Sequence, residues 1–360
     1  RRLSFDTLAF GSGLAATCAI LTGVALAFWG AGFWSLFGME IVRRLVLLTH
    51  CVSKAGWRPG LEHRSHHLVE VLRFATKRIE NEGLAYIAGN ALPRGAVGQF
   101  LGAEALGLFD VAKRLLERVR EILIGPIGRV TFPAAARLQT DPVRMQRLIE
   151  ASIRISTWVF WPTVLGLIAL APQFVPLILG PRWEAAVPVF QLLAVAALRA
   201  PVYAVNKSVL TATAWLKAIT TIHLIRIGLG LALIPIGLQA GVVGVAAALA
   251  LRQWLIWPVV ANYVHRACGL APRRQLTVLL RAALPSIGMT AMLYAALWWQ
   301  GGGGAPVADL AVYSVAGGLA YLLLWSLANM HEARHLMGAA RSFLQGDRGR
   351  MKAQLSEVLQ

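Results

Sequence analysis

The stretch that decides the fold is ISTWVFWPTVLGLIALAPQFVPLILGP, residues 155–181, which contains no charged residue. An α-helix needs about 20 consecutive apolar residues to cross the hydrocarbon core of a bilayer, so this run is long enough for a complete span. Similar uncharged runs cover residues 7–39, 227–251, 282–308 and 310–330. The chain is therefore predicted to be an integral membrane protein built from transmembrane helices.

The composition excludes the soluble classes of protein. Of the 360 residues, 57% are hydrophobic and only 14% are charged, and the mean hydropathy is +0.60. A soluble domain carries about 25% charged residues, so this chain has too little polar surface to cover a water-exposed globule. The three cysteines, Cys18, Cys51 and Cys268, are too far apart for a disulfide framework or a metal site.

We predict ten transmembrane helices once weaker segments that contain charges are added to these runs. The run over residues 7–39 is too long for one span and is broken at Gly30-Ala31-Gly32, so it holds one helix and the start of a second. The predicted fold class is an all-α, polytopic membrane helix bundle. The ten spans are residues 8–29, 31–52, 71–95, 104–128, 155–178, 186–211, 216–237, 241–263, 277–299 and 307–329.

The positions of lysine and arginine predict the topology. Basic residues concentrate in the loops at 53–70, 129–154 and 264–276 and in the tail after residue 330, whereas the alternate loops contain Arg182 and almost nothing else. Cytoplasmic loops carry an excess of Lys and Arg, so both termini are expected in the cytoplasm. Most of the net charge of +18 is then a topology signal, and no nucleic-acid partner is expected.

The third and fourth spans carry rows of charged residues. Spacings of three, four and seven residues place one row on a single face of a helix over 104–128, and Glu70, Arg73, Lys77 and Asn81 form a similar row on the preceding helix. Such helices could lie flat on the membrane or cross it with the polar face toward a water-filled cavity, and their length of about 25 residues favours crossing. The first row consists of Asp110, Lys113, Arg114, Glu117, Arg118 and Glu121.

Three arginines stand alone in otherwise apolar spans. Arg199, Arg226 and Arg252 each fall near the predicted middle of the membrane. An arginine facing lipid costs at least ~2.5 kcal/mol, so these side chains are expected to face a cavity, where three cations at one depth imply an anionic ligand. The alternative is that each arginine pairs with a carboxylate elsewhere or reaches toward the membrane surface.

Catalytic and metal motifs are weak in this chain. His331-Glu332-Ala333-Arg334-His335 matches the zinc-binding pattern H-E-x-x-H, but only Asp347 and Glu357 follow as a third ligand. His63, His66 and His67 lie in a basic loop, which is typical of a solvated surface. We therefore expect no metal, no cofactor and no catalytic residues, and we expect the tail over 330–360 to be an amphipathic cytoplasmic segment without zinc.

Three sequence blocks resemble a known family. They are VGQFLGAEALGLFDVAKR at 97–114, VTFPA at 130–134 followed by RLQTDP at 137–142, and LGPRW at 179–183. In this order the blocks are similar to those of Wzx-type polysaccharide flippases of the multidrug/oligosaccharidyl-lipid/polysaccharide exporter superfamily. The similarity is strongest over residues 74–198. Phe109 departs from the family motif, which usually has Tyr at this position.

The resemblance implies a transporter with two six-helix lobes around a cavity that opens alternately to either side. Residues 1–52 would then be the last two helices of the N-terminal lobe, and 53–70 a basic cytoplasmic linker. The C-terminal lobe would be 71–263, the extra terminal pair of helices 277–329 and the tail 330–360. About four N-terminal helices of the family would be missing, so the chain is expected to be a fragment.

The resemblance also implies a cargo, an undecaprenyl-diphosphate-linked oligosaccharide translocated across the bacterial inner membrane. Expected partners are this lipid-linked oligosaccharide, membrane lipids and other polysaccharide-assembly proteins. Two alternatives remain: a multidrug antiporter, which favours acidic cavity residues, and a ligase or polymerase of polysaccharide assembly, which needs long external loops. The cations expected to line the cavity are Arg73, Lys77, Lys113, Arg114, Arg118, Arg199, Arg226 and Arg252, with Asp110 and Glu117 as carboxylates that hold neighbouring cations.

The charged rows have an alternative, purely structural interpretation. Charges on the third and fourth spans could form a ladder of ion pairs between the two helices instead of binding a ligand.

Overall fold

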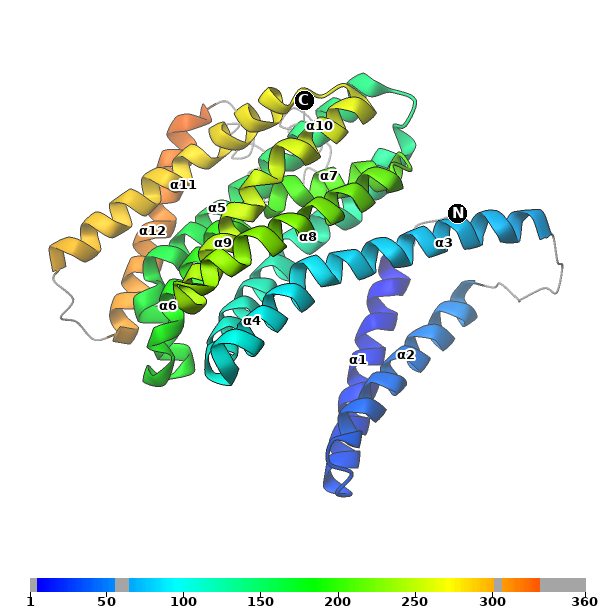
Figure 1. Ribbon diagram of the computed structural model, residues 1–360, viewed down its shortest axis with the longest axis horizontal. Coiled ribbons are helices and arrows are strands. Elements are labelled where there is room, and N and C mark those ends of the chain that lie inside the picture. Colours follow the sequence, from blue (N-terminus) through cyan, green and yellow to red (C-terminus); the bar gives the residue numbers. More distant parts are fainter. Residues whose placement is uncertain (1–4, 56–64, 301–305, 331–360) are drawn as a thin grey trace, which may run out of the picture. The chain divides into compact units, whose positions relative to one another are not determined.

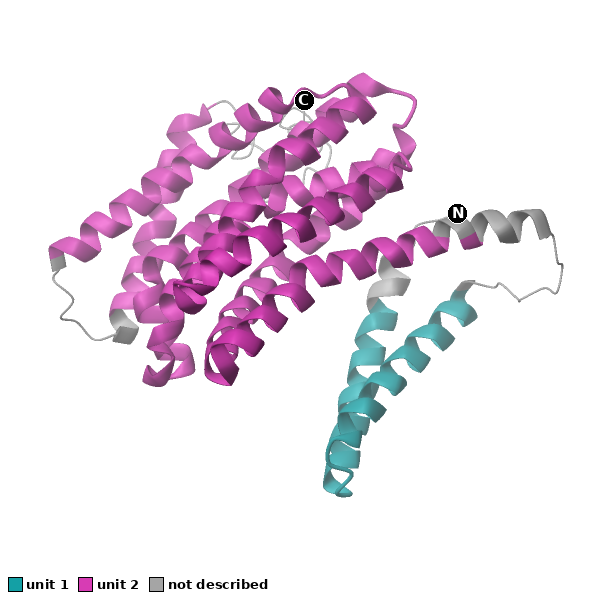
Figure 2. Cartoon of the chain, in the orientation of Figure 1, with its two compact units in different colours: residues 1–71 teal, residues 72–360 magenta. Residues whose placement is uncertain are grey.

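The computed structural model describes residues 5–55, 65–300 and 306–330, which consist of helices joined by short turns (Figure 1). The chain divides into two compact units, residues 1–71 and 72–360 (Figure 2). Each unit is considered by itself. The predicted separation of a six-helix lobe over 71–263 from a terminal pair over 277–329 stays a prediction.

The first unit contains a pair of packed helices, α1 (Phe5–Phe28) and α2 (Trp34–Ala55). Between them, Gly30 and Gly32 have φ of 78° and 49°, a left-handed backbone that glycine adopts without strain. The predicted break within the first apolar run is therefore confirmed. Small residues bring the two helices together, with Ala15 and Ala19 almost fully buried.

The second unit holds the remaining helices, apart from the first residues of α3, which belong to the first unit. Connections between them are short, and Gly269 ends one helix in the left-handed conformation typical of a helix C-terminus. The elements are α3 (Ser65–Tyr86), η1 (Ile87–Ala91), α4 (Leu92–Arg137), α5 (Pro142–Leu179), η2 (Pro181–Ala186), α6 (Val187–Ala197), α7 (Ala200–Ala212), α8 (Leu216–Leu238), α9 (Gly241–Leu255), α10 (Trp257–Cys268), α11 (Pro272–Gln300) and α12 (Pro306–Ala328).

The helices confirm an all-α membrane bundle. Within the described parts of the chain, six helical segments are long and apolar enough to span a membrane, and a bent pair formed by α6 and α7 could be a seventh. The helices α2, α3 and α4 carry more charges and are not among them, so crossing by these three stays a prediction. A protein with this many apolar helices is a multi-pass membrane protein.

Two helices extend beyond their predicted spans. The segment 129–154, predicted as a loop, is mostly helical because α4 continues to Arg137 and α5 already begins at Pro142. Asp141 caps α5 by accepting a 3.0 Å hydrogen bond from the backbone N–H of Arg144, and proline at the first helical position favours the start of a helix. The charges in this segment therefore do not end either helix.

A sharp bend at Gly102 separates the third and fourth predicted spans. This residue has φ of 85° and ψ of 180° inside α4, a conformation that only glycine adopts readily. The helix that starts as α3 therefore runs through the π-helical turn η1 into the first part of α4, and the chain then turns into the second part of α4. This arrangement agrees with the predicted boundary between residues 95 and 104.

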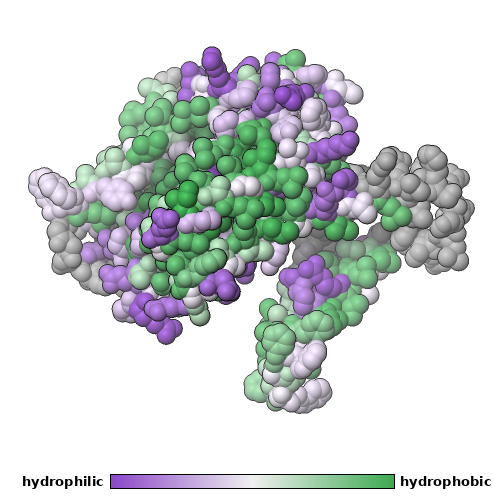
Figure 3. All heavy atoms as spheres, in the orientation of Figure 1, coloured by the Kyte–Doolittle hydropathy of each residue, from purple (hydrophilic) through white to green (hydrophobic). Residues whose placement is uncertain are grey.

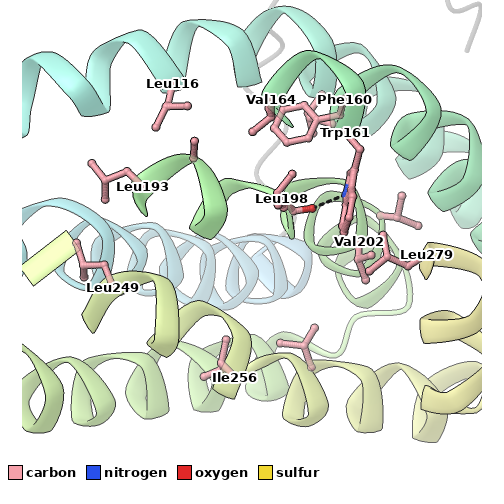
Figure 4. Close-up of a cluster of buried hydrophobic side chains, with 14 of the residues drawn as sticks. Leu116, Phe160, Trp161, Val164, Leu193, Leu198, Val202, Leu249, Ile256 and Leu279 are labelled. Carbon is pink, nitrogen blue, oxygen red and sulfur yellow. Dashed lines mark hydrogen bonds between the residues drawn. The ribbon is translucent and has the colours of Figure 1, made fainter. Parts of the chain in front are cut away.

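The predicted span 186–211 is a broken helix. The chain bends by 42° between α6 and α7, next to Pro201, which has no backbone N–H to continue the helical ladder. The indole N–H of Trp161 donates a 2.9 Å hydrogen bond to the carbonyl oxygen of Leu198 at the break (Figure 4). The break is thus supported by a buried side chain, and it leaves Arg199 at the N-terminus of α7.

The core of the second unit is assembled from helices far apart in the sequence. Phe109 of α4, Phe160 of α5 and Phe190 of α6 are almost fully buried, and Figure 4 shows neighbouring parts of this cluster. A smaller cluster around Met289 and Tyr313 joins α5, α11 and α12. Many large hydrophobic side chains lie on the outside, where they form the broad apolar areas visible in Figure 3, as expected for a lipid-facing surface.

Candidate functional site

A cavity of about 610 Å³ with several charged lining residues lies within the second unit, lined by residues of α3, η1, α4, α6, α7, α8 and α9. This volume is typical of sites that bind small molecules. Two of the lining residues are carboxylates, Glu82 and Glu117, and six are cations. The cations are Lys113, Arg120, Arg199, Lys207, Arg226 and Arg252.

Three of these cations form a buried group that we call the arginine cluster: Arg199, Arg226 and Arg252. They come from three different helices, and their exposed fractions are 3%, 7% and 2%. Arg199 donates a 3.0 Å hydrogen bond to the side-chain oxygen of Gln253. The guanidinium groups of Arg199 and Arg226 also lie 4.8 and 5.7 Å from the centre of the Tyr203 ring, within the range of cation–π attraction.

The arginine cluster is incompletely paired. Five of their nitrogen atoms are buried and have no hydrogen-bond partner in the described part of the chain: Nε and Nη1 of Arg199, Nε and Nη1 of Arg252, and Nε of Arg226. No carboxylate in the described residues forms an ion pair with any of the three. Buried charges without partners are costly, so a ligand that brings negative charge into this part of the cavity is strongly favoured.

Lys113 is held against the wall of the cavity by the irregular turn η1. Its ammonium group donates hydrogen bonds of 2.5 Å to the carbonyl oxygen of Gly89 and 2.7 Å to the side-chain oxygen of Asn90. The π-helical turn is a departure from the regular helical ladder, and such turns are frequent at functional sites. The contact fixes the distance between the α3–η1 segment and the second part of α4.

An ion pair between two helices also lines the cavity. The ammonium group of Lys207 on α7 lies 3.2 Å from the carboxylate of Glu82 on α3, and both side chains are at least one third exposed. The lining thus contains both an exposed ion pair and the buried arginine cluster.

The structure brings together only part of the predicted site. Lys113, Glu117 and the three members of the arginine cluster line the same cavity. The predicted cations Lys77, Arg114 and Arg118 and the carboxylate Asp110 are not among its lining residues, and the side chain of Arg73 lies outside the described residues.

The excluded residues have other partners or face outward. Asp110 pairs with Arg94 at 2.6 Å, Lys77 with Glu80 at 2.6 Å, and Arg118 with Glu121 at 2.9 Å. The charged stripe of α4 is wider than the cavity, so only the row formed by Lys113, Glu117 and Arg120 faces it, whereas Arg114 is exposed. The alternative of an ion-pair ladder is supported by one pair, since Arg94 of the third predicted span pairs with Asp110 of the fourth across the bend at Gly102. The other ion pairs on these spans join residues of the same helix or, for Glu82, a residue of α7.

Several lining residues were missed at the level of sequence. Glu82, Tyr86 and Asn90 recur every four residues along α3 and η1, and Lys207 lies on the same face of α7 as Arg199 and Tyr203. Both rows could have been found from helical spacing. In the described ranges no group of three potential metal-binding side chains occurs. The tail with His331 and His335, the Gly301–Gly304 loop and the side chains of His63, His66 and His67 lie outside them.

The fold resembles that of a solved transporter. The chain superposes on the lipid II flippase MurJ in an inward closed conformation with a TM-score of 0.63 and 14% sequence identity, over 88% of this chain and 67% of MurJ. At this identity the likeness concerns the fold.

Curated relatives are similar in sequence. The lipopolysaccharide biosynthesis protein WzxC of Escherichia coli (strain K12) is 29% identical over 67% of this chain and 50% of its own length. The succinoglycan biosynthesis transport protein ExoT of Rhizobium meliloti (strain 1021) is 25% identical over 54% of this chain and 39% of its own. The chain thus spans half or less of the length of these relatives.

A family model described as polysaccharide biosynthesis protein matches residues 1–188, which is more than half of the chain. This match includes all three sequence blocks. The chain therefore belongs to this family of polysaccharide biosynthesis proteins.

Proposed function

We propose that this chain is part of a flippase that moves an undecaprenyl-diphosphate-linked oligosaccharide across the bacterial inner membrane by alternating access. The observation that carries the proposal is the arginine cluster, three buried cations that line one cavity and have no carboxylate partner among the described residues. The cargo crosses without any chemical change, so the proposal includes no catalytic step.

The chemistry of a diphosphate matches this cluster. A diphosphate cannot enter hydrocarbon unaided, because the loss of its hydration is not compensated there. Arginine presents several N–H donors in a planar arrangement that suits phosphate oxygens, and Arg199 and Arg252 each have two N–H-bearing nitrogens available. The N-terminus of α7 at Arg199 adds the positive end of a helix dipole, as in other transporters with broken helices.

The names of the similar proteins support the same class of cargo. ExoT is named a transport protein of succinoglycan biosynthesis, and MurJ is named a lipid II flippase. A polysaccharide biosynthesis protein with a flippase-like fold and a cationic cavity is most simply a carrier of a lipid-linked saccharide.

The charges favour this proposal over the alternatives. A multidrug antiporter for cationic compounds would need an acidic cavity, whereas six cations and two carboxylates line this one. A ligase or polymerase would need catalytic groups on long external loops, whereas the predicted external turn between α8 and α9 contains only Gln239 and Ala240.

The positive-inside rule gives the orientation within this proposal. The basic segments over 53–70, 129–154 and 264–276 are expected in the cytoplasm, so both termini are cytoplasmic.

The proposal is tested in cells with the full-length protein. The double variant Arg199→Gln/Arg252→Gln is expected to abolish surface polysaccharide while the amount of protein in the membrane stays unchanged. The matched control is Arg144→Gln, which removes an exposed arginine at the start of α5 and should leave export intact. Normal export by the well-expressed double variant would contradict the proposal.

A further inference from the structure

One aromatic ring contacts two members of the arginine cluster. Tyr203 lies one helical turn after Arg199, and its backbone N–H donates a 3.1 Å hydrogen bond to the carbonyl oxygen of Arg199. The two side chains therefore lie on the same face of α7. The ring centre is 4.8 Å from the guanidinium group of Arg199 and 5.7 Å from that of Arg226 on α8. Tyr203 thus joins cations that come from two neighbouring helices.

The two arginines differ in their other partners. Arg199 also donates a hydrogen bond to Gln253 on α9. The guanidinium group of Arg226 makes no hydrogen bond or ion pair with any group in the described part of the chain, and its Nε atom is buried. The contact with the ring of Tyr203 is therefore the attraction that holds Arg226 beside Arg199 when no ligand is bound.

A neutral ring suits this position better than a carboxylate. Two buried guanidinium groups repel each other, and the repulsion is stronger inside a protein than in water because the interior screens charge poorly. A carboxylate between them would offset the repulsion, but it would also cancel positive charge that attracts an anionic ligand. The face of an aromatic ring attracts cations and carries no net charge. Tyr203 can therefore hold the two arginines together while the site stays cationic.

The hydroxyl group of Tyr203 is separate from this contact. It makes no hydrogen bond with the described residues and is not among the buried polar atoms without a partner, so it is open to the cavity. The ring is therefore not fixed by its hydroxyl group. This separation allows the ring and the hydroxyl group to be tested independently.

We propose that Tyr203 is a positioning residue of the anion site, whose ring holds Arg199 and Arg226 as a pair that binds a diphosphate together. The inference rests on the proposed function and deepens it, because it adds a neutral residue to a site argued so far from its cations. A diphosphate offers two charged groups to the pair, whereas a monophosphate needs fewer cations. The ring should therefore matter more for a diphosphate than for a monophosphate.

The test compares the binding of undecaprenyl diphosphate and undecaprenyl monophosphate to purified full-length protein. Tyr203→Leu keeps an apolar side chain but removes the ring, so it should weaken binding of the diphosphate about tenfold and of the monophosphate less than about threefold. Tyr203→Phe keeps the ring and should retain most of the affinity that Tyr203→Leu loses. The matched control is Tyr263→Leu, which removes a partly buried tyrosine outside the cavity and should bind both lipids like the wild type.

A second measurement separates the charge distribution of the ring from its shape. Fluorine atoms withdraw electron density from an aromatic face and weaken its attraction for cations, with little change in size. Tyr203→Phe is prepared with none, one, two or three fluorine atoms on the ring. The affinity for the diphosphate should fall stepwise with each fluorine atom while the amount of folded protein stays the same. This series also decides the matter if Tyr203→Leu does not fold.

The outcomes separate this inference from the proposed function. If Tyr203→Leu binds the diphosphate as tightly as the wild type, or weakens both lipids by the same factor, the positioning role is overturned and the proposed function stands. An affinity that does not respond to fluorine, or a Tyr203→Phe variant as weak as Tyr203→Leu, overturns the role of the ring as well. If the wild type binds neither lipid, the proposed function fails and the positioning role fails with it.

Discussion

The guanidinium group of Arg252 occupies space that Gly230 leaves on the neighbouring helix. A Cβ atom on Gly230 would lie 2.8 Å from Nη1 of Arg252 and 2.8 Å from a methyl group of Leu92. Glycine inside a helix lowers the free energy of unfolding by about 0.5–1 kcal/mol relative to alanine. At Gly230 this loss of stability leaves room for the side chain of Arg252. The shape of α8 thus determines where one cation of the arginine cluster can lie.

Gly230→Ala is therefore expected to displace Arg252 and reduce export without loss of folded protein. The matched control is Gly228→Ala on the same helix, where the added methyl group meets nothing within 4 Å. Surface polysaccharide and membrane abundance are measured for both variants in the full-length protein. Equal export by the two variants would show that the contact with Arg252 is unimportant.

Lys113 and Arg118 lie on the same charged stripe of α4, but their substitution should have different effects on ligand binding. Lys113 lines the cavity, whereas Arg118 is outside it with a side chain that is 80% exposed. Lys113→Gln should reduce binding of undecaprenyl diphosphate at least about tenfold, the usual effect of losing a charged contact of 1.5–3 kcal/mol. Arg118→Gln should change it less than about twofold, because an exposed ion pair contributes little. A similar loss of binding in both variants would instead agree with the prediction from helical spacing, which placed both residues in the cavity.

Trp161→Phe tests how the break between α6 and α7 is stabilised. The variant leaves the buried carbonyl oxygen of Leu198 without its donor, which should lower the free energy of unfolding by about 1–3 kcal/mol. Thermal unfolding in detergent compares it with Trp298→Phe, where the side chain is 83% exposed. If both variants unfold at the same temperature, the hydrogen bond does not support the break.

The topology can be tested at two exposed turns. Cysteines are introduced at Thr140, between α4 and α5, and at Gln239, between α8 and α9, after the native cysteines are replaced. An impermeant thiol reagent added to intact cells should label Gln239→Cys only, because the basic segments are expected in the cytoplasm. Labelling of Thr140→Cys alone would invert the proposed orientation.

Much of the fold could be predicted from the sequence because the bilayer imposes a simple length rule. The apolar runs predicted the membrane helices, and Gly30-Ala31-Gly32 predicted the first turn. The break at Leu198 and Arg199 was harder to predict, because Pro201 alone does not distinguish a bent helix from a broken one. The donor that supports the break, Trp161, comes from another helix.

The site was only partly predictable, for a related reason. An isolated charge is easily recognised in an apolar span, so Arg199, Arg226 and Arg252 could be predicted from the sequence as cavity residues. On α4 the helical spacing defines a wide stripe but not the part of it that faces the cavity, since this depends on how α4 packs against α7 and α9. The exposure of Tyr86 likewise follows from packing and has no signal in the sequence.

The measurement that tests the central claim most directly is translocation in proteoliposomes. The full-length protein is reconstituted with an undecaprenyl-diphosphate-linked oligosaccharide placed in the inner leaflet, and an external lectin reports its arrival outside. The wild type should make the oligosaccharide accessible over time, and the Arg199→Gln/Arg252→Gln variant, present at the same abundance, should not. Equal accessibility with both proteins, or no difference between the wild type and protein-free vesicles, would contradict the role of the arginine cluster in carrying the diphosphate.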